Sequence, residues 1–194
     1  MSFCHSRCIE VVKQFLGTIV PRALFRALDV AGGDGRFSTA LLLKNYGRVD
    51  HFDQCPRAVR LAQRAMLRNP AAGFVQQSTM QDFSWPFRYS GIFMLWCSGY
   101  LPAAELSTFL QKAKSNLMEG PGRFTRSSTK ESFIFLLDNV LGEGEELELL
   151  KGQRVRSQEQ LEAIFDEAGL IVHKCSGRQA MPDGFRDVVM WALY

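Results

Sequence analysis

Short apolar segments alternate with amphipathic segments along most of the chain, and this alternation restricts the fold more than any other feature. The strand candidates lie at 27–31, 48–53, 73–77, 92–96 and 133–137. The segment 48–53 is assigned by its alternation of residues rather than by apolar content. The amphipathic segments have apolar residues at helical spacing, and they lie at 8–19, 37–46, 56–68, 102–118 and 157–168. Strands that alternate with helices predict a mostly parallel sheet with helices on both faces.

The end of the chain breaks this alternation. Two further strand candidates, 170–174 and 188–193, follow one another without a helix between them, so we expect them to pair as a hairpin. They bring the predicted strands to seven. The helix before them has signals at both ends, since Ser157 and Gln160 have capping-box spacing and Gly169 follows the last turn.

The composition is that of one folded domain. The chain has 194 residues, of which 46% are hydrophobic and 22% charged, and these values exclude a disordered chain. The net charge of +3 is too small to indicate nucleic acid, and no apolar run reaches the roughly 18 residues of a membrane span. We therefore expect neither direct nucleic-acid binding nor membrane insertion. We divide the chain into an N-terminal helical segment, 1–26, and one main domain, 27–194.

The five cysteines are an odd number at scattered positions, which indicates reduced thiols rather than a disulfide framework. The pair at positions 4 and 8 has no second half of a zinc site, so we expect no metal. Reduced thiols favour a cytoplasmic and/or nuclear location. A mitochondrial location is less favoured, although basic residues outnumber acidic ones near the N-terminus.

The segment that carries most chemical information is 29–36, with the sequence Asp-Val-Ala-Gly-Gly-Asp-Gly-Arg. It leaves a strand and enters a helix, and its glycines allow a tight turn and a close approach of the backbone to a ligand. Asp53 ends the next strand, 20 residues after Gly33, where a carboxylate can accept both hydroxyls of a ribose. Asp82 follows the third strand, where it can meet an adenine amino group.

Three interpretations of this loop are open. The first is a tight strand-to-helix turn with solvated acids and no ligand. The second is a dinucleotide site, which the sequence disfavours because Ser38 stands where the third glycine of that pattern belongs. The third is a site for S-adenosylmethionine, whose cationic methionine end and ribose hydroxyls both favour carboxylates. We favour the third.

From 27 to 194 the sequence resembles the protein α-N-terminal methyltransferases, a family of the seven-strand S-adenosylmethionine-dependent class. Two matching stretches are generic for the class: 27–29 with the glycine loop, and 49–50 with Asp53. The more specific ones are Gln-Asp-Phe at 81–83, Trp96 with Gly99 and Leu101, Asp-Asn at 138–139, and Pro-Asp at 182–183. Further matching positions lie within 109–117, 168–170 and 192–193.

The resemblance implies a Rossmann-like seven-strand sheet that is mostly parallel, with an antiparallel last strand and helices on both faces. It implies methyl transfer from S-adenosylmethionine to the α-amino group of proteins that begin with X-Pro-Lys or a similar sequence. The cofactor positions it implies are Ala31, Gly33, Gly35, Arg36, Asp53, Gln54, Met80, Gln81, Asp82 and Leu95. Among them, Arg36 would pair with the methionine carboxylate through its guanidinium group.

The resemblance also implies residues that handle the peptide substrate. Trp96 would line the peptide channel and pack on the substrate proline, and Tyr100 stands where the family has a histidine. Asn139 would hydrogen-bond near the substrate N-terminus, and we place it with the catalytic residues. Since the amine must lose a proton before transfer, we expect a general base, with Glu148 as the first candidate and Asp138 as the second.

The sequence departs from the family pattern mainly where the substrate would bind. A glycine-tyrosine-glycine segment that covers the peptide channel is not found in the 26 residues before the first strand, Leu95 replaces a glutamine, and Lys151 replaces an acid. A second hypothesis is therefore a non-catalytic methyltransferase-fold subunit for binding or assembly. A third is a methyltransferase for a small molecule or a nucleic acid, although Trp-Cys-Ser-Gly at 96–99 replaces the Asn-Pro-Pro-Tyr type motif of base methylation.

Two segments near the predicted site are polar. Residues 143–148 contain four acids, which either attract a basic substrate tail or form a solvated loop or helix face. Residues 119–132 are rich in glycine, serine and lysine, and we expect a loop there.

Overall fold

The computed structural model describes residues 2–17, 25–118, 132–149, 152–180 and 186–194. The described chain forms two compact units, the first from Met1–Phe93 and Asn116–Phe133 and the second from Met94–Ser115 and Ile134–Tyr194. Most of the predicted loop 119–132, together with Lys151 and Pro182–Asp183, lies outside the described residues. Within the described ranges, no helix is long and apolar enough to cross a membrane.

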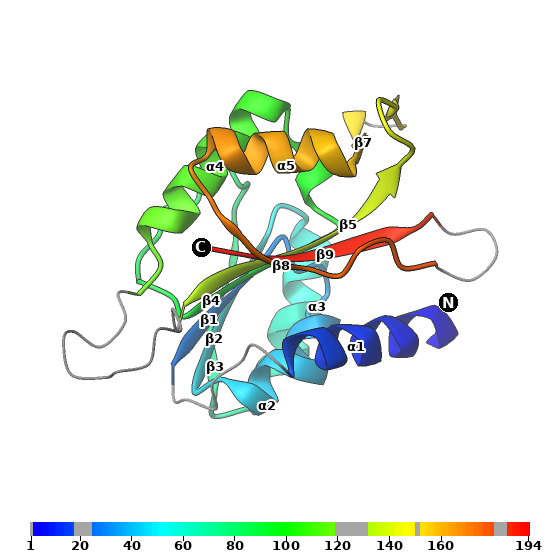
Figure 1. Ribbon diagram of the computed structural model, residues 1–194. Helices are drawn as coiled ribbons and strands as arrows, with labels where there is room; N and C mark the ends of the chain where they lie inside the picture. The colour runs from blue at the N-terminus through cyan, green and yellow to red at the C-terminus, as the bar shows by residue number, and fades with distance from the viewer. Residues whose placement is uncertain (1, 18–24, 119–131, 150–151, 181–185) are drawn as a thin grey trace, which may run out of the picture. The chain divides into compact units, whose positions relative to one another are not determined.

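The first unit contains a parallel sheet with helices (Figure 1). Its elements are α1 (Ser2–Leu16), β1 (Arg26–Val30), the π-helix η1 (Ser38–Leu42), α2 (Leu43–Asn45), β2 (Arg48–Asp53), α3 (Pro56–Met66), β3 (Ala72–Gln77) and the first part of β4 (Gly91–Leu95). The strands lie in the order β3-β2-β1-β4, and β2 is parallel to both β1 and β3. The register places Val30 opposite Phe52, so β1 and β2 end at the same edge of the sheet.

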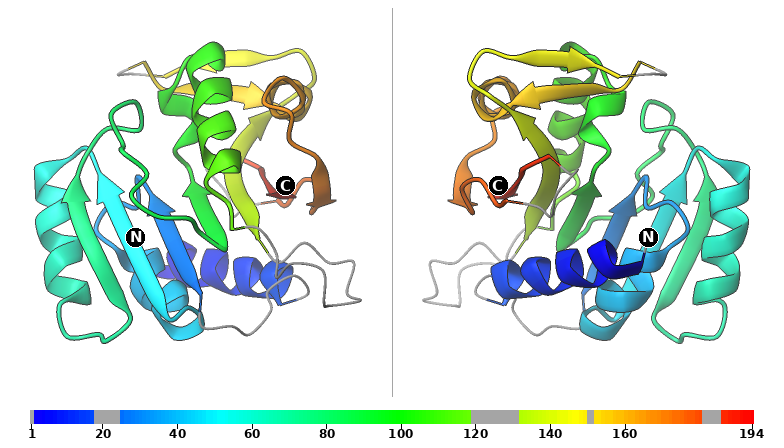
Figure 2. Two further views of the ribbon diagram at one scale, coloured as in Figure 1. Left: turned by 90° about the vertical axis from the view of Figure 1, so that its left-hand side faces the viewer. Right: turned by 90° about the vertical axis from the view of Figure 1, so that its right-hand side faces the viewer.

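Burial explains why these segments are strands and helices. All five residues of β2 after Arg48 are buried, as expected for a parallel strand covered on both faces. The helix α3 begins at Pro56 and turns Val59, Ala62 and Met66 inward. Figure 2 shows α3 alongside β3, with which it has its most extensive contact.

The helix predicted over 37–46 is present, but its first part is a π-helix followed by the single turn α2. Side chains in this stretch bond to backbone carbonyls four residues earlier: the Thr39 hydroxyl donates to Gly35 O at 2.9 Å, and the Asn45 amide donates to Leu41 O at 2.7 Å. Such bonds compete with the regular helical pattern. Single π-turns inside helices often accompany functional sites.

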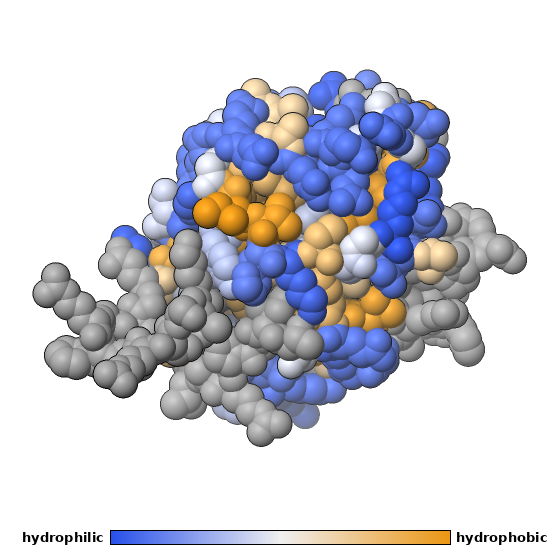
Figure 3. Space-filling model, viewed as in Figure 1, coloured by the Kyte–Doolittle hydropathy of each residue, from blue (hydrophilic) through white to orange (hydrophobic). Residues whose placement is uncertain are grey.

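The second unit combines parallel and antiparallel strands. Its elements are the end of β4, the 3-10 helix η2 (Ser98–Tyr100), α4 (Ala103–Ser115), β5 (Phe133–Leu141), β6 (Glu146–Glu148), β7 (Arg154–Ser157), α5 (Gln158–Glu167), β8 (Val172–Cys175) and β9 (Val188–Leu193). The strand β5 is parallel to β7 and antiparallel to β9, and β9 pairs with β8 as an antiparallel hairpin. On the face drawn in Figure 3, hydrophilic side chains divide the hydrophobic surface into separate patches.

The predicted fold class is confirmed: a mixed α/β sheet whose strands are mostly parallel, with an antiparallel last strand. The hairpin of the last two strands and the capping box at Ser157 are also confirmed. The prediction of seven strands is wrong, since the described residues contain nine. The missed strands are β6 and β7, which are three and four residues long and carry charged side chains, and their antiparallel pairing places Glu148 opposite Arg154. The division of the chain at residue 26 stays a prediction.

Candidate active site

The predicted cofactor loop has an unusual backbone. Ala31, Gly33 and Gly35 have positive φ angles of 49°, 61° and 78°. Glycine adopts this left-handed conformation at little cost, but alanine does so rarely. The alternation of left-handed residues turns the chain sharply out of β1, and Gly35 N closes the turn by donating to Gly32 O at 3.2 Å. Backbone strain of this kind is typical of ligand-binding loops.

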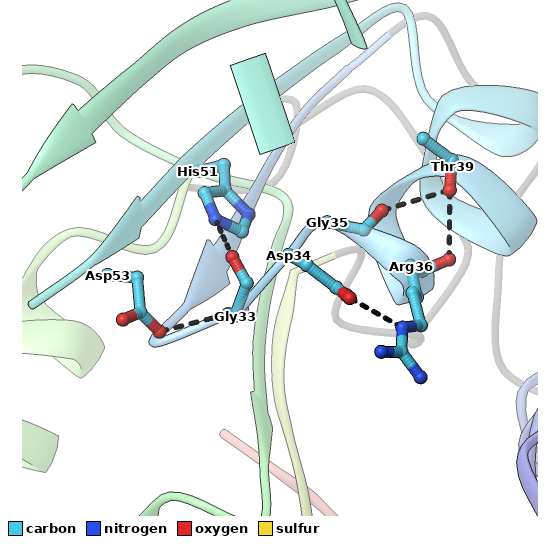
Figure 4. A network of polar contacts seen from close by, with 7 residues as sticks. All are labelled: Gly33, Asp34, Gly35, Arg36, Thr39, His51 and Asp53. Atoms are coloured by element: carbon cyan, nitrogen blue, oxygen red, sulfur yellow. Dashed lines mark hydrogen bonds and ion pairs between the residues drawn. The ribbon is translucent and has the colours of Figure 1, made fainter. Parts of the chain in front are cut away.

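Asp53 is held directly beside this loop. Its Oδ2 accepts a hydrogen bond from Gly33 N at 2.9 Å (Figure 4). Its Oδ1 accepts one from Cys55 N at 2.8 Å. The residue is 8% exposed, so its carboxylate is fixed at the end of β2 but still accessible from solvent. Each carboxylate oxygen has a further lone pair. Asp53 can therefore accept ligand hydroxyls while it holds the loop.

The two sides of the loop backbone differ in the space around them. A Cβ atom added at Gly33 would meet nothing within 4 Å. A Cβ atom added at Gly32 would lie 2.5 Å from Cγ of Asp29 and 2.6 Å from Cε1 of His51, so this side is tightly packed. A loop that is packed on one side and open on the other fits a ligand that approaches the backbone closely. These residues therefore fit the S-adenosylmethionine that the sequence predicts.

A buried histidine supports the packed side of the loop. His51 Nε2 lies 3.2 Å from Gly33 O, and Nδ1 lies 3.5 Å from Oδ2 of Asp29, which also accepts a 2.5 Å hydrogen bond from the Ser38 hydroxyl. Burial lowers the pKa of His51, but its contact with Asp29, together with Gly33 O and the charge of Asp53, outweighs burial and leaves the pKa raised. Sequence reasoning missed His51. The sequence holds no signal for its role, which comes from the parallel register that places it opposite Asp29.

The other predicted cofactor residues of the first unit lie nearer the surface. The exposed Arg36 donates from Nε to Oδ2 of Asp34 at 2.6 Å (Figure 4), so its guanidinium is paired with an acid of the loop itself. Asp82 accepts a 2.7 Å hydrogen bond from the Thr79 hydroxyl. The remaining three residues are buried Met80 and exposed Gln54 and Gln81.

In the second unit, Leu95 ends β4 and Trp96 follows it with a φ of 53°. A positive φ at a bulky side chain is a genuine outlier. It is held by a hydrogen bond from Trp96 N to Leu137 O at 2.8 Å, and the indole side chain is only half-buried. The combination of strain and partial exposure supports a functional role for Trp96 more than a role in the core.

Asp138 is a buried residue of β5 that follows Leu137, the residue to which Trp96 N donates. Its Oδ2 accepts hydrogen bonds from Ser98 N at 3.2 Å and the Ser98 hydroxyl at 2.5 Å, and its Oδ1 accepts one from Asn139 N at 2.8 Å. Burial raises the pKa of Asp138, while these bonds and the charge of Arg156 partly oppose the rise. Buried Arg156 in turn donates to Leu101 O at 2.7 Å. Sequence reasoning missed both Ser98 and Arg156.

The other predicted substrate and catalytic residues are spread over the second unit. Asn139 is half-buried next to Asp138, and Tyr100 in η2 is 48% exposed. Glu148 is exposed on β6, which β7 separates from β5. Two strand spacings amount to about 10 Å. The structure therefore groups Asp138 with Asn139 and does not bring Glu148 to them.

Comparisons with known proteins agree with these observations. Residues 7–194 match the family described as AdoMet-dependent proline di-methyltransferases. The chain is 26% identical over 176 residues to the α-N-terminal protein methyltransferase 1 of Oryza sativa subsp. indica, covering 86% of this chain and 53% of the relative. It is also 26% identical over 169 residues to the N-terminal Xaa-Pro-Lys N-methyltransferase 1-B of Xenopus laevis, covering 86% and 71%. The chain thus spans about half the length of the rice relative.

Solved structures show the same fold. A SAM-dependent methyltransferase from Leishmania major superposes with a TM-score of 0.87 at 24% identity, covering all of this chain and 74% of that one. The 1,6-didemethyltoxoflavin-N1-methyltransferase of Burkholderia thailandensis, solved with S-adenosylhomocysteine, has a TM-score of 0.71 at 16% identity, covering 96% and 76%. The family resemblance and the S-adenosylmethionine-dependent class predicted from the sequence are confirmed. The individual site residues stay predictions.

Proposed function

Because the chain belongs to the family of AdoMet-dependent proline di-methyltransferases, we propose that it transfers methyl groups from S-adenosylmethionine to the α-amino group of proteins with an X-Pro-Lys type N-terminus. The observation that carries the proposal is the strained glycine loop with Asp53 bonded to Gly33 N. The name of the Xenopus relative supports the choice of substrate.

The first unit would hold the cofactor, which supplies an electrophilic methyl group on a sulfonium sulfur. Asp53 would accept the ribose hydroxyls, since both its oxygens are already oriented by backbone donors. The open side of Gly33 would admit the ligand to the loop backbone. Arg36 would exchange its contact with Asp34 for a ligand carboxylate, which an exposed side chain can do at small cost.

The second unit would handle the peptide. An α-amine has a reference pKa of about 7.7–8.0, so a useful fraction is neutral near physiological pH and only modest base catalysis is needed. We assign that role to Glu148, with the substrate amine bound between its exposed carboxylate and Asn139, which lies about two strand spacings away. Asp138 would act as a positioning residue, because two hydrogen bonds from Ser98 tie its Oδ2 to the turn after Trp96 and Asn139 N occupies its Oδ1. Trp96 would pack on the substrate proline, and Asn139 and Tyr100 would contact the peptide.

Calorimetry with S-adenosylmethionine tests the cofactor half of the proposal. We compare the native chain, Asp53→Asn, and Asp166→Asn, which changes an exposed acid on α5. Hydrogen bonds to charged groups contribute about 1.5–3 kcal/mol, so we expect Asp53→Asn to bind roughly 10- to 100-fold more weakly. The Asp166→Asn variant should bind like the native chain. Absence of binding to the native chain would overturn the proposal.

Mass spectrometry of a peptide that begins Ser-Pro-Lys tests the transfer. We expect mass increases of one or more methyl groups on the free peptide and none on its N-acetylated form, which has no free α-amine. Binding of S-adenosylmethionine without transfer to either peptide would instead favour the non-catalytic binding subunit that the substrate-side departures suggest.

We further propose that the protein works in a reducing compartment, the cytoplasm and/or the nucleus. The three cysteines whose side chains are described, Cys55, Cys97 and Cys175, are thiols rather than halves of disulfide bonds, which supports this choice. Fractionation of cells that express the tagged full-length protein tests it.

A further inference from the structure

The exposed face of α3 carries a row of arginines that the proposed function does not use. Arg57, Arg60, Arg64 and Arg68, which we call the arginine stripe, are all exposed, and the last of them follows the end of α3. At 3.6 residues per turn their spacings of three and four residues place them on one face. Between 54 and 81 the sequence contains no acid to balance them. The rest of the chain has 19 basic against 20 acidic side chains, so the positive net charge comes from this segment.

The charges of the arginine stripe are not neutralised within the described part of the chain. No carboxylate there forms an ion pair with any of the four, whereas Arg26 pairs with Asp50 at 2.8 Å and Arg36 pairs with Asp34 at 2.6 Å. A helix face that serves only solubility usually mixes charges of both signs. A row of one sign indicates attraction of an anionic partner.

A groove lies beside the arginine stripe, between α3 and β3. Its volume is about 660 Å³. The α3 side is lined by Arg60, Gln63, Arg64 and Leu67, and the β3 side includes Ala72 and Val75. Leu67 is 78% exposed, which is a large area of apolar surface left in water. The groove therefore offers cationic and apolar contacts together.

The groove also borders backbone of an edge strand. In the described chain β3 pairs with β2 alone, so its other edge is free. The Gln63 side-chain amide donates to Val75 O at 3.0 Å, which shows that β3 carbonyl groups are within reach of the groove. A free strand edge binds extended peptides through main-chain hydrogen bonds.

We propose that an extended acidic segment of a partner protein docks in this groove, pairs with the free edge of β3 and turns its carboxylates toward the arginine stripe. Guanidinium groups bind carboxylates through two parallel hydrogen bonds, and acids at alternate positions of a strand all lie on one face, which can be turned toward Arg60 and Arg64. A second copy of this chain is disfavoured because the two arginine stripes would repel each other. No aromatic side chain lines the groove, so it lacks the stacking surface of a single-stranded nucleic-acid site.

Binding of fluorescein-labelled seven-residue peptides to the full chain tests the proposal at 150 mM salt. The probe alternates Glu and Val, and its control has the same composition in blocks, so that only the alternating peptide presents all its acids on one face as a strand. We expect the alternating peptide to bind at least tenfold more tightly. Equal binding of the two peptides would overturn the proposal, as would tighter binding of an oligouridine or of phosphatidylserine vesicles.

Matched charge reversals locate the binding surface. Arg64→Glu changes the arginine stripe, and Lys44→Glu makes the same change in charge at an exposed residue of α2. We expect Arg64→Glu to weaken binding of the alternating peptide at least tenfold and Lys44→Glu to change it less than twofold, since long-range charge effects are screened at this salt concentration. Similar losses in both variants would show non-specific attraction and refute the site. Because neither residue contacts the glycine loop, calorimetry with S-adenosylmethionine serves as an independent check that both variants are folded.

Discussion

Replacement of Gly33 by alanine has two expected effects that can be measured separately. Strain in the backbone lowers the free energy of unfolding, and the added methyl group lowers the affinity for the ligand. Gly33 has a φ of 61°, and a Cβ atom there would meet nothing within 4 Å. The substitution therefore creates no clash, and its cost to folding is only that of placing an L-residue in the left-handed region, roughly 1–2 kcal/mol. Alanine also restricts the unfolded chain, which offsets this cost by about 0.4–1 kcal/mol. We expect the free energy of unfolding of Gly33→Ala to fall by about 1 kcal/mol.

Gly144 provides a matched control. Its φ is 73°, and a Cβ atom there would also meet nothing within 4 Å. Gly144→Ala should therefore lose about the same 1 kcal/mol, which corresponds to a fall in Tm of roughly 2–4 °C for a chain of this size. The two variants should differ in ligand binding. The methyl group of Gly33→Ala points into the open space beside Asp53, so we expect it to weaken S-adenosylmethionine binding at least tenfold, and Gly144→Ala to leave it unchanged.

Thermal unfolding without ligand and calorimetry with S-adenosylmethionine measure the two effects separately. Native affinity in Gly33→Ala would show that the ligand does not approach this backbone, and the assignment of the loop would then be refuted. An equal loss of affinity in Gly144→Ala would mean that destabilisation alone weakens binding. A fall in Tm in Gly33→Ala much larger than in Gly144→Ala would show that the loop is under a constraint other than its φ angle.

Three further substitutions examine the buried polar groups and the strain at Trp96. The pKa of His51 is raised above 6.5, so its stabilising contribution is present below that pH and is lost as pH rises through the folded-state pKa. Urea unfolding should therefore show that the native chain and His51→Gln differ most in free energy of unfolding near pH 5.5 and converge at higher pH. Trp96→Gly should be more stable than Trp96→Ala by about 1 kcal/mol, because only glycine adopts its φ of 53° without strain; urea unfolding that ranks alanine higher would contradict this. Ser98→Ala removes a 2.5 Å hydrogen bond to buried Asp138, and should lower the free energy of unfolding by about 1–3 kcal/mol at pH 7; a loss under about 0.5 kcal/mol would show that Ser98 N and water replace the hydroxyl.

The sequence predicted the strands and helices that follow from hydrophobic pattern and chain punctuation. The strand 48–53 is found at its predicted bounds, and the prediction rested on its alternation of residues, since only Val49 and Phe52 in it are apolar. The strands β6 and β7 were missed because each is short and alternates charged with apolar residues, which also fits a loop or helix face. Their pairing comes from a partner strand, and a single sequence does not show which strands become neighbours.

The candidate site was predictable only where local chemistry defines it. Gly33 and Asp53 were identified from their spacing after two strands, and the structure joins them by a 2.9 Å hydrogen bond. His51 and Arg156 could not be identified in the same way. Each is a buried charged or titratable residue whose role depends on a partner that only the fold brings to it: Asp29, opposite His51 in the register, and Leu101 O, which follows η2, for Arg156.

In each unit the chain leaves a strand through a non-glycine residue with left-handed φ, Ala31 after β1 and Trp96 after β4. Each costs roughly 1–2 kcal/mol relative to glycine at the same position. Such strain persists when neighbouring groups fix the conformation, and here Asp53 holds Gly33 N while Asp138 holds the residues after Trp96. Glycine at this position would relieve the strain but would also remove the half-buried indole ring, so the contribution that offsets the strain is either packing of the ring or contact with a ligand. If that contribution is contact with the peptide, Trp96→Gly should raise the KM for the peptide and leave S-adenosylmethionine binding unchanged. An unchanged KM would show that Trp96 contributes to packing rather than to peptide binding.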